Sequence, residues 1–180
     1  MAYYIGGVSI PHATYDEFKN ATLGNQYDYD GWYQCQCWDF CQELYYQYNL
    51  TLYTGPQGYA IECWTVSRSL NAVLPFTDIV QGKQNIKKGD MLVFYGTAGN
   101  PAGHICLADE DYNGTDRLNC LGQNQRGDPT LGVTVDSLNL LELAGYFRNS
   151  YWQGTPPPTP TGRSKFPWVL FARKFRNGLR

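Results

Sequence analysis

The sequence predicts an α+β domain in which amino-terminal helices pack on a mostly antiparallel sheet. Apolar residues at helical spacing are confined to about the first 72 residues, whereas short apolar runs separated by glycine and asparagine turns follow from residue 89. Helices first and strands afterwards are typical of this class. A chain of 180 residues with 43% hydrophobic residues is also large enough to bury one core.

Three segments carry helix signals, and they span about residues 15–23, 37–48 and 60–72. Thr14 and Glu17 form a capping box at the start of the first segment, and Gly24 ends it. The second segment begins at Cys37 and repeats its apolar residues with helical spacing. The third is expected to be a single further helix.

Five segments predict strands after a turn at Gly89-Asp90, and they span residues 91–95, 104–110, 117–123, 132–136 and 144–148. The dipeptide Asn113-Gly114 indicates a hairpin between two of them. The proline-rich segment 155–162 predicts an extended linker or surface arm. We therefore expect a domain over residues 1–150, and an extension over 151–180 made of this arm and a basic, aromatic tail.

Charge is distributed unevenly along the chain. The net charge is −2, which excludes a generally basic nucleic-acid binder. The last 18 residues carry six Lys or Arg and no acid, so this tail either contacts an anionic polymer or forms a last amphipathic strand. No apolar run reaches the roughly 20 residues of a membrane helix. The amino terminus lacks signal-peptide features, so we expect synthesis in the cytoplasm and no membrane insertion.

Six cysteines form an even set, at positions 35, 37, 41, 63, 106 and 120. Without an export signal we expect reduced thiols, most of them buried as small apolar groups. Cys35 and Cys37 are too close in sequence for an unstrained bridge. A transition-metal site built from Cys35, Cys37, Cys41 and His104 is an alternative, but it lacks the paired ligand spacing of zinc sites.

A cysteine and a histidine suggest nucleophilic catalysis. Cys37 is expected at a helix amino terminus, where the helix dipole and a nearby imidazolium lower a thiol pKa and backbone N–H groups can hold an oxyanion. His104 opens a later strand, whereas His12 lies in the irregular amino-terminal segment, so His104 is the candidate base. Asn124 follows a strand and could orient the imidazole. The alternative is a buried Cys and His that never meet, with Asn124 in a turn.

The acidic segment before Cys37 has the ligand spacing of a calcium loop. Positions 1, 3, 5, 7 and 12 of such a loop fall on Asp28, Asp30, Trp32, Gln34 and Asp39. Trp32 and Gln34 would contribute backbone carbonyls, and the three aspartates would contribute carboxylates. The pattern departs from an EF-hand because Gly31 is at position 4 and an Asp closes the loop. A solvated acidic loop is the alternative.

The chain resembles the CHAP family, the cysteine, histidine-dependent amidohydrolases/peptidases of phage lysins and bacterial wall hydrolases. The resemblance extends over about residues 15–150 and rests on four motifs in order: Gln36-Cys37-x-Asp39, Gly89-Asp90, Gly103-His104-Ile105 and Gln123-Asn124. It implies a papain-like (NlpC-type) fold and hydrolysis of amide bonds in peptidoglycan.

The resemblance also implies roles for individual residues. Cys37 would be the nucleophile, His104 the base and Asn124 a third polar member. Some phage lysins of this family hold calcium in the loop before the nucleophile, which favours one Ca²⁺ ion bound by the five loop positions named above. One departure is that many relatives have Glu two residues before the Asn, where this chain has Gly122.

These features together predict a cysteine-dependent amidase or endopeptidase, either a released phage lysin or a virion-associated wall hydrolase. The expected partners are bacterial peptidoglycan and, for a virion component, other phage proteins, with no nucleic acid. Two alternatives remain. One is a structural or wall-binding component of a phage particle with the same fold, and the other is a different papain-like acyltransferase or peptidase.

Overall fold

The computed structural model describes residues 11–31, 34–80 and 82–154. Its helices are α1 (Tyr15–Thr22), α2 (Cys37–Gln47), α3 (Glu62–Thr65) and α4 (Arg68–Asn71), with 3-10 turns η1 (Lys83–Asn85) and η2 (Leu140–Glu142). Its strands are β1 (Phe76–Ile79), β2 (Met91–Phe94), β3 (His104–Ala108), β4 (Arg117–Gly122), β5 (Thr134–Asn139) and β6 (Leu143–Asn149). The strands form one sheet in the order β1-β6-β2-β3-β4-β5 with antiparallel pairing throughout. The predicted α+β class is confirmed.

The first two helices begin where the sequence predicts. The Thr14 hydroxyl accepts from the Glu17 backbone N–H at the start of α1, and Gly24 follows the helix with a φ of +81°. At the start of α2, the Asp39 carboxylate accepts from the backbone N–H of Gln36 across 2.8 Å. This contact satisfies a donor that a helix end leaves unpaired, so it fixes the residue before Cys37.

The prediction of one helix over residues 60–72 is wrong, because the segment forms the two short helices α3 and α4. The chain leaves helical geometry at Ser67, where φ is −106° and ψ is 17°. The Ser67 hydroxyl donates to the carbonyl of Thr54, and the Asn71 amide donates to the carbonyls of Tyr53 and Cys63. The break therefore places the side chains of Ser67 and Asn71 where they donate hydrogen bonds to backbone carbonyls earlier in the chain.

The five predicted strands are all present, with shifted ends, and the sheet has one more. The sequence analysis missed β1, a short edge strand of mixed polarity that pairs with β6. The strand expected at 132–136 instead begins at Thr134 and runs to Asn139. Asn113-Gly114 lies in the connection between the antiparallel strands β3 and β4, as the hairpin signal indicates.

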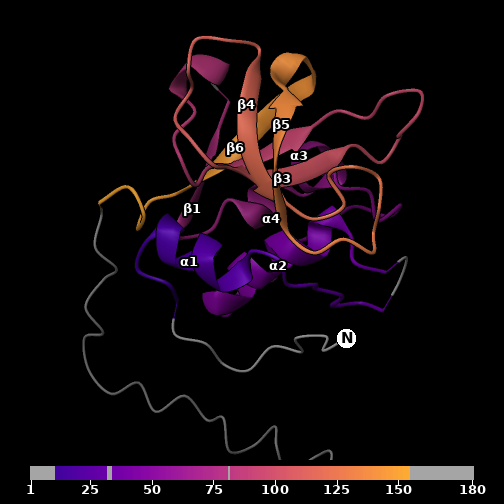
Figure 1. The fold of residues 1–180 in the computed structure, drawn as a ribbon, viewed down its shortest axis with the longest axis horizontal. Helices are drawn as coiled ribbons and strands as arrows, with labels where there is room; N and C mark the ends of the chain where they lie inside the picture. Colours follow the sequence, from indigo (N-terminus) through magenta and orange to yellow (C-terminus); the bar gives the residue numbers. More distant parts are fainter. Residues whose placement is uncertain (1–10, 32–33, 81, 155–180) are drawn as a thin grey trace, which may run out of the picture.

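The helices cover one face of the sheet. Figure 1 shows α1 and α2 together on the same side, and α2 packs on the central strand β3. Phe18, Phe40 and Leu44 from these helices form a core cluster with Ile105 and Leu107 from β3. A second cluster lies on the other face of the sheet. All six cysteines are buried and unbridged, as expected.

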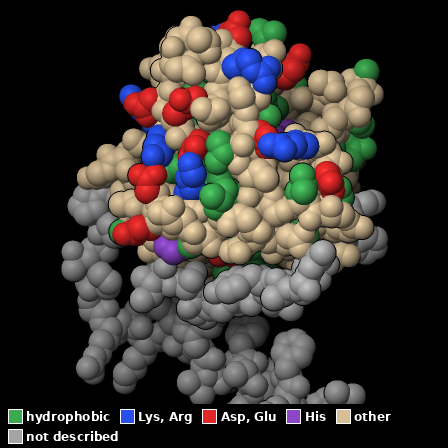
Figure 2. All heavy atoms as spheres, viewed as in Figure 1, with side chains coloured by type: hydrophobic (Ala, Val, Ile, Leu, Met, Phe, Trp, Pro, Cys, Tyr) green, Lys and Arg blue, Asp and Glu red, His purple; other side chains and the backbone are tan. Residues whose placement is uncertain are grey.

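Ion pairs join the helical layer to loops at the ends of the central strands β2 and β3. Lys19 of α1 pairs with Asp109 across 2.7 Å, and Lys88 pairs with Asp16 across 2.6 Å. Figure 2 shows Lys and Arg side chains interspersed with Asp and Glu on one face of the molecule. Neither sign of charge dominates this face.

Packing continues beyond the predicted domain boundary at residue 150. The Trp152 ring lies 5.7 Å from the Tyr15 ring and 5.5 Å from the Phe18 ring, so it belongs to the core around α1. The proline-rich arm and the basic tail over 155–180 lie outside the described residues. Among the helices in the described ranges, none has the length and apolar character to cross a membrane.

Candidate active site

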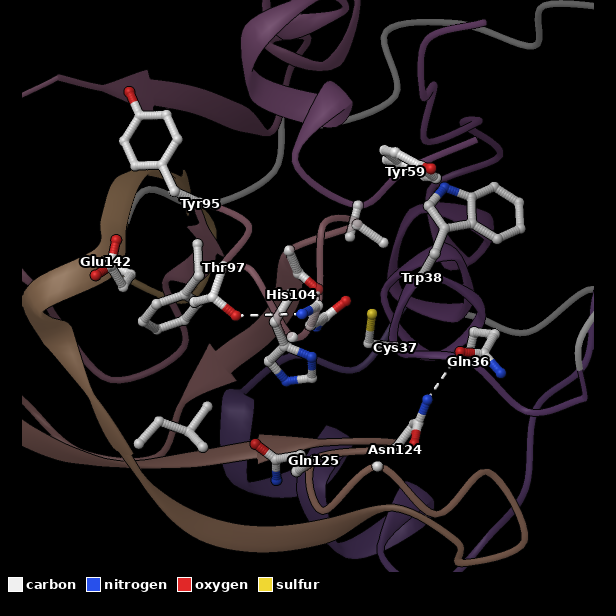
Figure 3. Close-up of a pocket in the computed structure, with 18 of the residues that line it drawn as sticks. Gln36, Cys37, Trp38, Tyr59, Tyr95, Thr97, His104, Asn124, Gln125 and Glu142 are labelled. Atoms are coloured by element: carbon white, nitrogen blue, oxygen red, sulfur yellow. Dashed lines mark hydrogen bonds between the residues drawn. The ribbon is translucent and has the colours of Figure 1, made fainter. Parts of the chain in front are cut away.

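A cleft of about 1080 Å³ opens where the amino terminus of α2 meets the start of β3. Cys37 and His104 both line this cleft, although 67 positions separate them in the sequence. Figure 3 shows the Cys37 sulfur and the His104 ring in its centre, coming from α2 and β3. The structure thus brings together the two residues that the sequence analysis selected as nucleophile and base.

The segment that follows β4 holds the helix start that carries Cys37. The Gln123 amide is buried and donates to the carbonyls of Tyr27 and Gln36, across 2.8 and 3.1 Å. Its oxygen accepts from the backbone N–H of Tyr27 across 2.9 Å. The next residue, Asn124, donates to the side-chain oxygen of Gln36 across 2.8 Å. These bonds fix the turn of chain from which the Cys37 side chain enters the cleft.

A glycine and a strand pair position His104. Gly103 has a φ of +70°, and a Cβ there would lie 2.4 Å from the carbonyl oxygen of Phe94, so only glycine fits. His104 then pairs with Phe94 in the β2–β3 ladder. The two rings lie 6.3 Å apart, with Phe94 beside the imidazole. The close approach of β2 therefore sets the direction in which the imidazole leaves β3.

Burial sets the protonation of both groups. It raises the pKa of the Cys37 thiol to about 11, against the lowering effect of the backbone N–H groups of Ile105, Trp38 and Cys37 itself. Burial also lowers the pKa of His104 to about 4, and the Gln125 side chain acts in the opposite direction. His104 keeps some surface in the cleft, although its Nε2 atom is buried. The resting pair at neutral pH is therefore a neutral thiol and a neutral imidazole.

Asn124, the predicted orienting residue, donates its amide N–H to Gln36, and its Oδ1, the atom that could accept from the imidazole, is buried without a hydrogen-bond partner among the described residues. Its backbone adopts a left-handed conformation with a φ of +55°. The side chain whose contact affects the His104 pKa is that of Gln125, the next residue. The sequence analysis did not single out Gln125, although the glycine at position 122 signalled that another residue had to replace the acid.

The predicted calcium loop brings its three carboxylates together. Asp28, Asp30 and Asp39 each place one ligand oxygen within 4.8 Å of the others. Asp39 is buried and accepts from the backbone N–H groups of Tyr29 and Gln36. Burial, and secondarily the charges of Asp30 and Asp28, raise the Asp39 pKa to about 7.

The structure describes one of the two residues predicted to contribute a carbonyl ligand in this loop. Gln34 is exposed, has a φ of +65° and lines the cleft. Trp32 lies outside the described residues. The structure therefore assembles the carboxylate part of the predicted ligand set.

Aromatic side chains form two walls of the cleft. Figure 3 shows Trp38 and Tyr59 near each other on the Cys37 side, and Tyr95 with Glu142 on the opposite side of His104. The Trp38 indole N–H donates to the carbonyl of Leu52 across 3.2 Å, which fixes that ring. Among the described residues that line the cleft, Glu142 is the single charged one. The site is thus a largely uncharged cleft with aromatic side chains beside the thiol and beyond the imidazole (Figure 3).

Comparison with curated proteins gives a phage relative. The chain is 37% identical over 120 residues to a D-alanyl-L-alanine endopeptidase of Streptococcus phage B30. The match covers 64% of this chain and 25% of that protein, so it extends over a quarter of the relative's length. No family model matches the chain, so the CHAP resemblance stays a prediction.

Comparison with solved structures identifies the fold. The wild-type endolysin LysIME-EF1 matches with a TM-score of 0.57 and 22% identity, over 75% of this chain and 63% of that chain. Ly7917 is 26% identical over 41% of this chain and 31% of its own, with a TM-score of 0.34. The first match shows that the helices and sheet are arranged as in an endolysin.

Proposed function

We propose that this chain is a phage peptidoglycan hydrolase that cleaves an amide bond of the bacterial cell wall, with Cys37 as nucleophile and His104 as base. The observation that carries the proposal is the meeting of a thiol at a helix start and an imidazole at a strand start in one cleft. The relative named as a D-alanyl-L-alanine endopeptidase supports the substrate class. That name also makes a D-alanyl-L-alanyl bond the first one to test.

The proposed reaction proceeds through an acyl-enzyme. His104 takes the proton of the Cys37 thiol as the sulfur attacks the peptide carbonyl, and N–H groups at the start of α2 stabilise the oxyanion. His104 then gives its proton to the leaving nitrogen as the C–N bond breaks. A water molecule, deprotonated by His104, hydrolyses the thioester and restores the thiol.

The aromatic walls suit an extended substrate. Trp38 and Tyr59 on one side of Cys37 and Tyr95 on the other can contact successive units of a stem peptide or a sugar. Because Glu142 is the only charged side chain among the described lining residues, the groove favours a substrate that is neutral near the scissile bond. This agrees with an internal amide between alanine residues.

The proposal extends to one calcium ion at Asp28, Asp30 and Asp39. Three carboxylates with oxygens within 4.8 Å of one another repel when ionised, and a hard divalent cation removes that repulsion. The backbone carbonyls of Trp32 and Gln34 would complete the ligand set. When bound, the ion supplies positive charge that holds the acidic loop against the start of α2. Asp39 lies in α2 and accepts from the backbone N–H of Tyr29 in the loop, so the loop and the Cys37 helix would be ordered together.

Digestion of purified peptidoglycan tests the enzymatic proposal. The wild-type chain should release fragments whose masses and new termini identify one cleaved amide bond, and Cys37→Ala should release none. Cys41→Ala is the matched control, because Cys41 is buried one turn further along α2 and faces the core. Equal digestion by the wild type and Cys37→Ala would exclude this mechanism. A folded wild-type chain that releases no fragments would exclude the activity.

A further inference from the structure

Gln125 fills the space that a side chain at position 122 would need. Gly122 ends β4, and a Cβ built on it would lie 2.9 Å from the Cβ of Cys106 and 3.1 Å from the Cδ of Gln125. The first contact involves an atom next to the backbone of β3, so it cannot move away cheaply. An acidic side chain at 122 is therefore excluded, and the amide of Gln125 lies in its place.

The Gln125 amide is held in one orientation. Its nitrogen donates to the carbonyls of Cys120 and Thr134, across 2.9 and 2.8 Å. Both N–H groups are thus used on β4 and β5, and the amide oxygen must point the other way. A glutamate here would place a carboxylate oxygen against these two carbonyls, which explains why an amide suits this position.

The amide oxygen of Gln125 faces the His104 ring (Figure 3). The Gln125 Oε1 and the His104 Nε2 atoms are both buried, and neither has a hydrogen-bond partner among the described residues. Figure 3 shows the amide oxygen of Gln125 turned toward the His104 ring, on the side away from Cys37. No full hydrogen bond joins the two groups, but the Gln125 side chain is the polar contact that raises the His104 pKa against the effect of burial. Pairing would satisfy two buried polar atoms at once.

Asn124 Oδ1 is the other amide oxygen among the described cleft residues that is buried without a hydrogen-bond partner, but the Asn124 side chain is bonded to Gln36 at the start of α2. The neighbouring elements present the Cys37 thiol from α2 and the Phe94 ring from β2. Glu142 lies across the cleft, beside Tyr95. Burial lowers the pKa of His104, and the Gln125 side chain acts in the opposite direction.

We propose that Gln125, and not Asn124, is the positioning residue of His104. Its amide oxygen accepts the ring N–H that faces away from Cys37, so the unprotonated ring nitrogen faces the thiol. When the Cys37 proton moves to His104, the same oxygen stabilises the imidazolium that forms. This assignment rests on the proposed function only for the role of His104 as base, since the contact itself can be measured without substrate.

The direct test is the titration of His104 by NMR. The chain has two histidines, so a His12→Gln variant assigns the remaining signal. Gln125→Met keeps the side-chain volume but removes the oxygen, and it should lower the His104 pKa by roughly 0.5–1 pH unit. Gln125→Lys should lower it as well, while it retains a donor for the carbonyls of Cys120 and Thr134. This second variant covers the case in which the methionine protein fails to fold.

Activity on peptidoglycan supplies a second readout. In Gln125→Met, kcat should fall about tenfold with KM within about twofold, and the acid limb of the kcat/KM profile should move to lower pH. Gln42→Met is the matched control, since the buried Gln42 amide bonds to the backbone of Leu50 and Leu52, and Gln42 is not among the described residues that line the cleft. It should reduce stability and leave the acid limb in place.

Three results would overturn the assignment. The first is an unchanged His104 pKa in both Gln125 variants. The second is a pKa shift produced by Asn124→Gly instead. The third is a loss of activity in Gln125→Met that follows its melting temperature, as in Gln42→Met, with no movement of the acid limb. If the wild type does not act on peptidoglycan, the proposed function fails, while the NMR titration still decides the role of Gln125.

Discussion

The amide nitrogen of Asn124 donates to the side-chain oxygen of Gln36 across 2.8 Å, and this bond joins the end of β4 to the residue that precedes Cys37. Asn124, which the sequence suggested as the residue that orients the imidazole, is therefore bonded to the helix start that carries the nucleophile. Its role in the proposed mechanism is to hold the start of α2, from which the thiol and the oxyanion donors enter the cleft.

This relationship predicts how Asn124 variants behave. Asn124 has a φ of +55°, so alanine would add backbone strain to the loss of the hydrogen bond, whereas glycine would remove only the bond. Asn124→Gly should cost about 1 kcal/mol of stability and reduce turnover less than any change at Cys37 or His104. Asn124→Ala should be less stable than Asn124→Gly. Thermal unfolding and wall digestion check both statements, and equal stability of the two variants would contradict the strain argument.

Cys37 should be indispensable for wall digestion. Cys37→Ser and Cys37→Ala should abolish activity, because no other group near His104 can act as a strong nucleophile in the described cleft. Both proteins should keep the circular dichroism and melting behaviour of the wild type to within a few degrees. Cys41→Ala should instead lose about 1 kcal/mol of stability and keep its activity, since Cys41 is fully buried in the core. A Cys41 variant as inactive as Cys37→Ala would point to damage of the helix.

Burial of His104 predicts a pH dependence of stability with a definite sign. The His104 pKa lies near 4 in the folded chain, below its ordinary value of 6.5. Between these values the unfolded chain binds the proton and the folded chain does not, so the contribution of His104 to stability falls as the pH drops from about 6.5 toward about 4. The raised pKa of Asp39 acts in the opposite direction over the same range, so the two contributions are separated by a His104 variant. Below that window both states are protonated and the loss from His104 is complete, at roughly 3 kcal/mol.

Chemical denaturation at several pH values measures this dependence. The stability of His104→Gln relative to the wild type should increase as the pH drops from about 6.5 to about 4, and its activity should be lower by about 10²–10⁴. His12→Gln should keep the slope that His104 produces, because His12 packs beside Phe18, away from the cleft. If His104→Gln and the wild type lose stability in parallel across this range, His104 is not protonated on unfolding as described.

Sequence patterns predicted the parts of the fold that depend on local chemistry. Thr14 caps α1, Cys37 begins α2, and the apolar runs after residue 89 form strands, because caps and periodicity act within a few residues. The break at Ser67 was not predictable in this way. It depends on a hydrogen bond to Thr54, whose position is fixed only in the folded chain.

The same distinction applies to the site. Cys37 and His104 could be selected from their residue types and their places at element starts, and the structure puts both in one cleft. Gln125 could not be selected, because its orientation depends on carbonyl groups of two strands and on the missing side chain at Gly122. A residue that acts through its neighbours leaves little signal in a single sequence.

Calcium should stabilise the chain and support its activity if Asp28, Asp30 and Asp39 bind one ion. Stabilisation follows RT ln(1 + [L]/Kd), about 2.7 kcal/mol at 100 times Kd, which corresponds to a melting rise of roughly 5–11 °C for a domain of this size. Chelator should lower both the melting temperature and wall digestion. Calcium should restore them better than magnesium, which requires a small octahedral shell and retains its water.

Substitution of one exposed ligand separates calcium binding from general effects of charge. Asp30→Ala should mimic chelation and make the protein insensitive to calcium, because Asp30 is exposed and its carboxylate lies in the triad. Asp16→Ala removes an exposed acid of α1 that pairs with Lys88, and this variant should keep the calcium response. If chelator changes neither the melting temperature nor the activity of the wild type, the three carboxylates form a solvated acidic loop and Asp39 acts only as a cap for α2.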